Sequence, residues 1–216
     1  MNTTIPLVDR RNKTISTYVV FDLAAQLQEL EVGDRVELLI DDFEPITRDI
    51  ATWCEATGHR LLDSTTTPHG RSLTIERGSP RKNGSSLAMV ISADGLEELL
   101  SPLGFALAAA LEGMDVNLFF QGPAVRVLAT GFRPRLRGWA RPFSRFAAAS
   151  MSRTGHIPAQ QKLRQLVSLG ASIYMCAPSM QHFKVRTEDL IFAELPQVEY
   201  LTFMHVMARS DVQLYN

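Results

Sequence analysis

A short polar segment divides this sequence into two parts with different hydrophobic patterns. The segment is RGSPRKNGSS, residues 77–86, and it combines Gly, Pro, Ser, Asn and charge with almost nothing that a core could bury. We therefore predict a linker at 77–85 between two domains, at 1–76 and 86–216. A chain of 216 residues has room for two small domains.

The residues before the linker predict a small two-layer α+β domain. Ile15–Val20 is rich in β-branched and aromatic residues, which is typical of a strand, and Arg35–Ile40 alternates charged with apolar residues. Pro45 then opens a segment whose apolar residues recur at helical spacing. Two short strands are predicted after it, at His59–Thr65 and Ser72–Glu76.

Beyond the linker, apolar strands alternate with helices. Leu87–Ser92 is a continuous apolar run, typical of a strand that is buried on both faces, and Asp115–Phe120 and Ala171–Cys176 follow as further strands. Val212–Tyr215 predicts the last one. Because strands separated by helices form parallel sheets with helices on both faces, this part predicts a mainly parallel, three-layer α/β domain. An arginine-rich insertion at 123–157 interrupts the alternation.

Charge is distributed unevenly along the chain. The net charge is −1, so the chain as a whole does not favour a nucleic-acid partner, yet residues 116–187 carry eleven Lys or Arg and no Asp or Glu. The segment FRPRLRGWARPFSRF, residues 132–146, lies within this region. Three interpretations of it stay open: a solvated loop, a docking surface for an acidic partner or an anionic sulfur donor, and a contact with membrane or RNA.

Cys176 is the strongest candidate for reactive chemistry. It ends an apolar strand, and in open α/β sheets ligands bind outside the carboxyl ends of the strands. Pro178 and Ser179 suit the start of a helix, whose free N–H groups and dipole favour a thiolate over a thiol. The alternative is that Cys176 is a small buried hydrophobe, which is the expected role of Cys54 on the apolar face of its helix.

Other residues are candidates for lining the same site. Asp94 follows the first strand of the second domain, although turn chemistry accounts for it as well. His182 lies six residues after Cys176 and could reach it, although a solvent-facing or core position is the commoner situation for a histidine. The remaining candidates near the cysteine are Ser179, Met180 and Lys184.

No motif indicates a metal, a cofactor or a targeting segment. The five histidines show no metal-ligand spacing, and no glycine-rich nucleotide motif occurs. The N-terminus lacks the apolar core of a signal peptide, and the longest apolar stretch is far shorter than the ~20 residues of a membrane-spanning helix. Two cysteines do not form a disulfide framework. We therefore expect a cytoplasmic protein without a bound metal or cofactor.

The residues around Cys176 resemble the DsrE/DsrF-like sulfur-relay family. IYMCAPSMQHFKV, residues 173–185, is similar to the family's strand that ends in a cysteine and is followed by a Ser-Met pair. AMVISADGLEELLSPLGFALAAALEGMDVNLFFQGPAV, residues 88–125, is similar to its opening strand, Ala-rich helix and next strand. The resemblance covers about residues 86–216.

This resemblance implies a persulfide carrier. Cys176 would accept a sulfane sulfur from one protein and pass it to another. An enzyme with this activity would be a sulfurtransferase. The implied partner is a sulfur-donor or sulfur-acceptor protein, which would be acidic if it binds the arginine-rich insertion. The resemblance also implies a homo-oligomer of this chain.

The first domain resembles the TusA/SirA family, the usual partner fold in sulfur relay. The match lies in AQLQELEVGDRVELLIDDFEPITRDIATWCEATGHRLLD, residues 25–63, and extends over about residues 15–76. That family carries a Cys-Pro-x-Pro motif at the start of its first helix, where the cysteine bears the sulfur. The corresponding positions here are Ser16, Thr17, Tyr18 and Val19. Since a serine hydroxyl cannot carry a persulfide, we expect the fold without its chemistry.

Two functions fit these observations. The first is a sulfur-relay protein that carries persulfide sulfur on Cys176. The second is a non-catalytic interaction or regulatory module that retains both folds for binding partners. A thiol redox sensor would need a second, resolving cysteine, and the sequence offers only Cys54.

Overall fold

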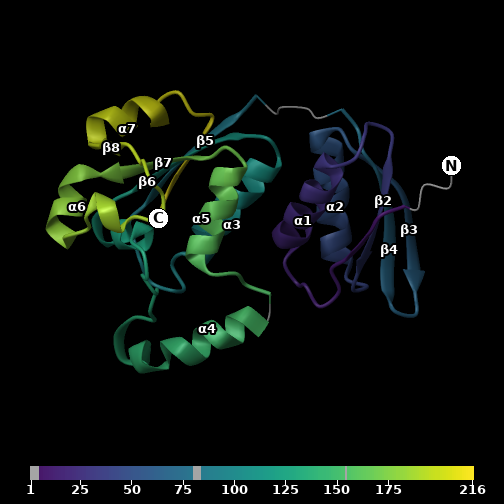
Figure 1. The fold of residues 1–216 in the computed structure, drawn as a ribbon, viewed down its shortest axis with the longest axis horizontal. Coiled ribbons are helices and arrows are strands. Elements are labelled where there is room, and N and C mark those ends of the chain that lie inside the picture. Colours follow the sequence, from purple (N-terminus) through teal and green to yellow (C-terminus); the bar gives the residue numbers. More distant parts are fainter. Residues whose placement is uncertain (1–4, 80–83, 154) are drawn as a thin grey trace. The chain divides into compact units, whose positions relative to one another are not determined.

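The computed structural model describes residues 5–79, 84–153 and 155–216, and the chain forms two compact units (Figure 1). The first unit is built mainly from the residues before position 84 and the second mainly from those that follow. The predicted linker at 77–85 lies partly outside the described residues, because these leave out 80–83. The domain boundary therefore stays a prediction.

The first unit consists of a four-stranded sheet and two helices. Its elements are β1 (Leu7–Asp9), α1 (Ser16–Gln28), β2 (Arg35–Ile40), α2 (Glu44–Thr57), β3 (Arg60–Thr67) and β4 (Gly70–Glu76). The strand order is β1-β2-β4-β3, with β1 parallel to β2 and the other pairs antiparallel. Both helices lie on the same side of this sheet (Figure 1). The predicted two-layer α+β arrangement is thus confirmed.

The predicted strand at Ile15–Val20 is wrong. These residues enter α1, and the first strand lies earlier in the chain, at Leu7–Asp9. The β-branched residues that favour a strand are buried here at helical spacing, so tertiary packing overrides their local preference. The buried face of α1 consists of Tyr18, Val19, Val20, Leu23 and Leu27.

The second unit is an α/β domain around a five-stranded sheet. Its elements in chain order are β5 (Ser86–Ile91), α3 (Leu100–Leu111), β6 (Asp115–Phe120), the 3-10 helices η1 (Gly122–Leu128) and η2 (Gly138–Phe143), α4 (Ser144–Arg153), α5 (Ala159–Ser168), β7 (Ser172–Cys176), α6 (Ala177–Phe183), η3 (Thr187–Asp189), β8 (Gln197–Val198), α7 (Tyr200–Met207) and β9 (Val212–Tyr215). The strand order is β8-β7-β6-β5-β9, and all four pairings are parallel.

Helices cover both faces of this sheet. Every residue of 87–91 on β5 is at most 5% exposed, so this interior strand buries both of its faces. α7 lies on one side of the strands, and α3 and α5 lie on the other (Figure 1). The predicted parallel three-layer α/β arrangement is confirmed, and the strand β8 is an addition that the sequence did not indicate.

The arginine-rich insertion at 123–157 contains several structural elements. It begins inside η1, whose residues Ala124, Val125, Val127 and Leu128 are buried and belong to the core. An irregular segment then leads into η2, and α4 begins at Ser144 directly after it. Because Pro142 lies inside η2, this part of the chain cannot continue as one long helix.

A buried lysine joins two helices of the second unit. Lys162 on α5 is 3% exposed, and its Nζ donates a hydrogen bond to the carbonyl oxygen of Leu100, at the start of α3, over 3.3 Å. Burial penalises the ammonium form and lowers the pKa of Lys162 to about 8.

We expect Lys162 to make the protein more stable as the pH rises from about 8 to about 10.5. In this window the unfolded chain holds the Lys162 proton more tightly than the folded chain, so the cost of burying the charge, present at lower pH, is progressively removed. Lys162→Met should remove this contribution, measured as the difference in the free energy of unfolding between wild type and variant along a pH series. The exposed Lys184→Met is the matched control. Parallel curves for wild type and Lys162→Met would contradict the prediction.

Candidate functional site

The cysteine of the second unit lies where a strand becomes a helix. Cys176 is the last residue of β7 and occupies the N-cap position of α6, and Pro178 stands in the first turn of that helix. The predicted strand end and helix start are therefore both present. Because the sheet is parallel, the same edge also carries the residues that follow β5 and β6.

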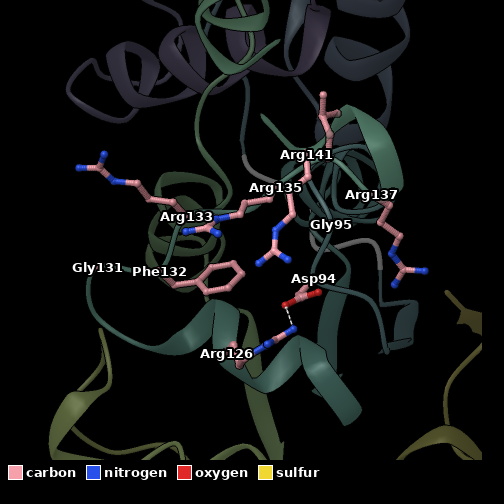
Figure 2. A pocket seen from close by; sticks show the side chains of 11 residues that line it. Asp94, Gly95, Arg126, Gly131, Phe132, Arg133, Arg135, Arg137 and Arg141 are labelled. Carbon is pink, nitrogen blue, oxygen red and sulfur yellow. Dashed lines mark ion pairs between the residues drawn. The ribbon is translucent and has the colours of Figure 1, made fainter. Parts of the chain in front are cut away.

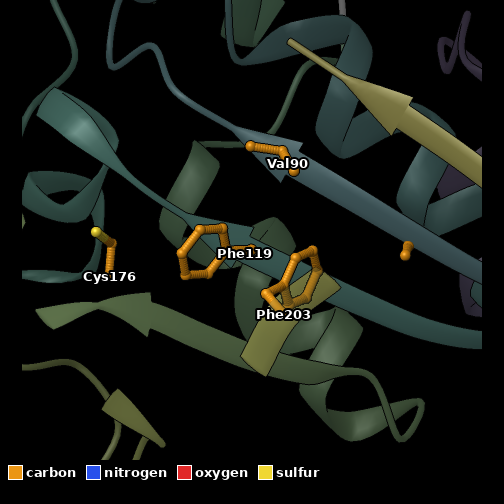
Figure 3. Close-up of a cluster of buried hydrophobic side chains, with 5 residues drawn as sticks. Val90, Phe119, Cys176 and Phe203 are labelled. Atoms are coloured by element: carbon orange, nitrogen blue, oxygen red, sulfur yellow. The ribbon is translucent and has the colours of Figure 1, made fainter. Parts of the chain in front are cut away.

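The side chain of Cys176 is fully buried. Its relative exposure is 0%, and it belongs to an apolar cluster on one face of the sheet with Ala88, Val90, Phe119 and Phe203. The rings of Phe119 and Phe203 stack at 4.7 Å between centroids, and Figure 3 shows Cys176 at one end of this group. In this arrangement the thiol reaches solvent only when a neighbouring side chain moves.

Tyr200 connects this buried thiol with the molecular surface. It is the first residue of α7 and is 57% exposed, and its ring packs edge-on against Phe119 of the apolar cluster at 6.2 Å between centroids. The pKa of the Tyr200 phenol is raised, first by the negative charge of the nearby Cys176 thiolate form and then by desolvation.

A second tyrosine lies at the same edge of the sheet. Tyr215 ends β9 and is 71% exposed, and its hydroxyl accepts a hydrogen bond of 2.9 Å from the side-chain amide of Gln121, the residue after β6. The charge of the Tyr215 phenolate form is a further cause of the raised pKa of Tyr200. Gln121 and Tyr215 thus lie at the same carboxyl edge of the sheet as Cys176, toward its β9 side.

Tyr200, Tyr215 and Gln121 were not among the residues that the sequence suggested. The position of Tyr215 could have been predicted, because Val212–Tyr215 was expected to be a strand of a parallel sheet. The carboxyl ends of parallel strands share an edge, so the last residue of this strand lies at the same edge as Cys176. The order of the strands, which places β9 next to β5, cannot be predicted from the local hydrophobic pattern.

Two of the residues suggested for the site, Ser179 and Met180, act in packing and hydrogen bonding around α6. The hydroxyl of Ser179 accepts a hydrogen bond of 2.8 Å from the backbone N–H of Gly122, which joins α6 to η1. Met180 is 4% exposed. Both lie within four residues of Cys176 and support the helix that begins at it.

His182 and Lys184 lie on the exposed side of the same segment. The His182 ring contacts the ring of Phe183 edge-on at 4.8 Å, and Lys184 follows the helix in a left-handed conformation with φ of 54°. Among the contacts of the described residues, none joins either side chain to Cys176. The more frequent alternative for His182, a solvent-facing position, is the one observed.

Asp94 lines a different hollow of the second unit. It follows β5 and forms an ion pair with Arg126 of η1, at the floor of a cavity of about 690 Å³ (Figure 2). The lining residues are Asp94, Gly95, Arg126, Gly131, Phe132, Arg133, Arg135, Leu136, Arg137, Gly138 and Arg141. Cys176 does not belong to this lining, so Asp94 and the thiol do not share one cavity.

The first unit contains the other cysteine. Cys54 on α2 is 1% exposed, as expected for a core residue, and burial raises the pKa of its thiol to about 12. Its thiolate is therefore scarce at neutral pH, and Cys54 is unsuited to nucleophilic chemistry in the folded chain.

The described residues contain neither a candidate metal site nor a candidate membrane span. Within 5–79, 84–153 and 155–216, His, Cys, Asp and Glu form no group of three or more that could hold a metal ion. No helix in the same ranges has the length and apolar character needed to cross a membrane.

Comparisons with known proteins concern mainly the second unit. The model of the DsrE/DsrF-like family matches residues 85–214, which is more than half of the chain. The chain is also similar to a solved structure, the crystal structure of the YchN protein from E. coli, with 14% sequence identity and a TM-score of 0.44 over 61% of this chain and 99% of that chain. A search of curated proteins found no match.

We expect Tyr200 to control access to Cys176. Iodoacetamide should alkylate Cys176 slowly in the wild type, because the side chain is 0% exposed, and Tyr200→Ala should raise the rate at least about tenfold. Tyr200→Phe keeps the ring that covers the thiol and removes only the hydroxyl, so it should react no faster than the wild type.

The matched control is Leu201→Ala, which truncates the neighbouring residue, itself 82% exposed. Its rate should equal that of the wild type. Rates are followed by mass spectrometry of peptides that contain Cys176. If Tyr200→Ala reacts as slowly as Leu201→Ala, Tyr200 does not block the thiol.

Proposed function

The chain belongs to the DsrE/DsrF-like family, and we propose that it is a sulfur-relay protein that carries sulfane sulfur as a persulfide on Cys176 and passes it to a partner protein. The observation that carries this proposal is the position of Cys176 at the end of β7 and at the N-cap of α6. Cys176 is also the only cysteine in the region that matches the family, which is generally associated with sulfur relay.

The proposed chemistry is a thiol–persulfide exchange. The Cys176 thiolate attacks the outer sulfur of a donor persulfide, R–S–SH, and a new S–S bond forms as the donor S–S bond breaks. The donor leaves as a thiolate, R–S⁻, and Cys176 becomes Cys–S–SH. The number of sulfur–sulfur bonds is unchanged, so the transfer needs no external oxidant or reductant. The same exchange in reverse, with an acceptor thiolate, returns the sulfur.

Transfer from this site requires that the thiol becomes accessible. Tyr200 is 57% exposed and its ring packs on Phe119 of the cluster that holds Cys176, so we propose that a rotation of this side chain at the start of α7 opens the site. We infer that a donor or acceptor protein docks next to α7 and displaces Tyr200. Without a partner the site would open only rarely, so small molecules would reach Cys176 slowly and the persulfide would react slowly with other thiols.

We propose that the first unit has a TusA/SirA-like role in binding and carries no sulfur itself. Ser16 is the first residue of α1, where that family has its cysteine, and its hydroxyl hydrogen-bonds with a carboxylate oxygen of Asp49 over 2.5 Å. A hydroxyl oxygen cannot form a persulfide. Cys54, the only cysteine of this unit, is buried in the core.

One observation favours the alternative function, a non-catalytic interaction or regulatory module. The 0% exposure of Cys176 is what a structural core cysteine shows, and in that case the family's fold would serve for binding alone. The two functions differ in one measurable property, the reactivity of Cys176 in the folded protein.

Self-association is a further part of the proposal. β9 is an edge strand of the sheet, and the apolar side chains of Val212 and Leu214 on it are 42% and 39% exposed. Unpaired edges with exposed apolar side chains favour pairing with another chain. We therefore propose a homo-oligomer that uses this edge.

This oligomer can be tested by placing a charge on the edge strand. Leu214→Glu should reduce the mass measured by light scattering to that of the monomer, because a carboxylate would be buried in the interface. Gln181→Glu introduces the same charge on the exposed side of α6 and should leave the mass unchanged. A wild type that is monomeric at all concentrations would contradict the proposal.

We expect polysulfide to add sulfur to Cys176 and not to Cys54. Mass spectrometry of the intact protein after incubation should show one added sulfur atom in the wild type, and Cys176→Ser should abolish it, because the serine hydroxyl cannot form the S–S bond. Cys54→Ala is the matched control and should be loaded like the wild type.

Tyr200→Ala distinguishes two explanations for a Cys176 that does not react: the thiol is covered, or it is accessible but unreactive. If alkylation shows that Cys176 is accessible in this variant and polysulfide still does not load it, the sulfur-relay proposal fails. A thiol that reacts only after denaturation, in every variant, would favour the interaction module instead.

A further inference from the structure

We propose that the arginine-lined cavity of the second unit binds a small phosphorylated molecule that carries at least two negative charges. The cavity is the one that contains Asp94 and Arg126, and its volume of about 690 Å³ lies in the range of small-molecule sites. This inference is independent of the persulfide chemistry, because Cys176 does not line the cavity.

The balance of charge in the cavity favours an anionic ligand. Five arginines line it, against the single carboxylate of Asp94. Asp94 pairs with Arg126, and Arg137 pairs with Glu98, which lies outside the lining, over 2.9 Å. Among the described residues no carboxylate forms an ion pair with the other three arginines, which are Arg133, Arg135 and Arg141. Three guanidinium charges are therefore left for a ligand to neutralise.

Backbone hydrogen bonds hold these arginines around the hollow. The carbonyl oxygen of Arg135 accepts a hydrogen bond of 3.0 Å from the N–H of Leu96, which ties the arginine segment to the residues after β5. The Ser144 hydroxyl accepts from the N–H of Leu136 over 2.9 Å and donates to the carbonyl oxygen of Arg141 over 2.6 Å. Ser144 is only 9% exposed. A framework that is fixed before binding reduces the entropy lost when a ligand is ordered.

Glu98 connects the residues after β5 with the arginine segment. Its carboxylate accepts a hydrogen bond from the Gly95 N–H over 3.2 Å and pairs with Arg137 over 2.9 Å. These two contacts help to hold the arginine segment beside the strand end.

The chemistry of the lining points to phosphate groups on an organic body. The guanidinium group presents a planar fork of N–H donors that matches phosphate oxygens in a bidentate geometry. Phe132 and Leu136, both half-buried, supply apolar wall for the rest of the ligand. A neighbouring cavity of about 720 Å³ shares Arg133, Arg135 and Arg141, so these three charges can be approached from two sides.

The observations favour a small molecule over an extended polyanion or a membrane surface. The most exposed aromatic residues of this region are Trp139, Phe143 and Phe146, at 87%, 55% and 76%, and none of them lines either cavity. Binding of single-stranded RNA combines charge with stacking on such rings, and membrane binding inserts them. Here the unpaired arginines line the two hollows, and the exposed rings do not.

The test is a titration of the full-length protein with inorganic pyrophosphate, followed by calorimetry, with sulfate and acetate as weaker-charged comparisons. Pyrophosphate should bind more tightly than sulfate, and acetate should not bind measurably. The double variant Arg135→Gln with Arg141→Gln should lose at least about tenfold in affinity, because it removes two charge-assisted contacts. Arg135→Lys keeps the charge and loses the fork, so its affinity should fall between those of the wild type and the double variant.

Arg164→Gln is the matched control, since Arg164 is an exposed arginine of the same unit that lies outside both cavities. Its affinity for pyrophosphate should equal that of the wild type, and circular dichroism confirms that each variant is folded. The proposal is overturned if the folded wild type does not bind pyrophosphate, or if Arg164→Gln weakens binding as much as the double variant. Binding to an RNA oligonucleotide or to anionic lipid vesicles without binding to pyrophosphate would also overturn it.

Discussion

The parallel pairing of β5, β6 and β7 is the constraint on which the rest of the second unit depends. Register is continuous along these strands, from Ser86 opposite Asp115 to Phe120 opposite Met175. A sheet of this kind must be covered on both faces, which explains why apolar residues fill the central strands and why helices lie on each side. It also brings the carboxyl ends of all five strands to one edge, where both candidate sites of this unit are located.

The packing that stabilises the sheet also limits access to its cysteine. Cys176 points to the same face as Val90 and Phe119, and α7 covers that face with Phe203. Burial of this apolar cluster contributes to stability, and a reactive thiol needs exposure, so the two requirements conflict at one residue. The half-exposed side chain at the start of α7 lies between these two requirements, because the ring of Tyr200 packs on Phe119 while much of the side chain faces solvent.

Local patterns in the sequence predicted most of the helices and strands. They failed where contacts between residues far apart in the sequence determine the structure. The strands at Arg35–Ile40, Asp115–Phe120 and Val212–Tyr215 carry their own signals and have those bounds in the structure. Ile15–Val20 looked like a strand because β-branched residues cluster there, yet packing against the sheet makes it helical. The position of Cys176 at a strand end was predictable for the same reason as the strands were, but its burial under α7 was not, because α7 follows it by more than twenty residues.

In the arginine-rich insertion, the number of charges does not show which of them are paired in the folded chain. Residues 116–187 contain eleven basic residues and no carboxylate, and this bias left open a solvated loop, a docking surface and a contact with membrane or RNA. The structure brings Asp94 and Glu98, from the preceding strand end and the residues after it, against Arg126 and Arg137, so part of that charge is neutralised across the sheet edge. What distinguishes the remaining arginines is therefore their lack of such a partner. Because like charges that line one hollow repel one another, these arginines do not stabilise the fold through their charge, and an anion that enters would relieve the repulsion.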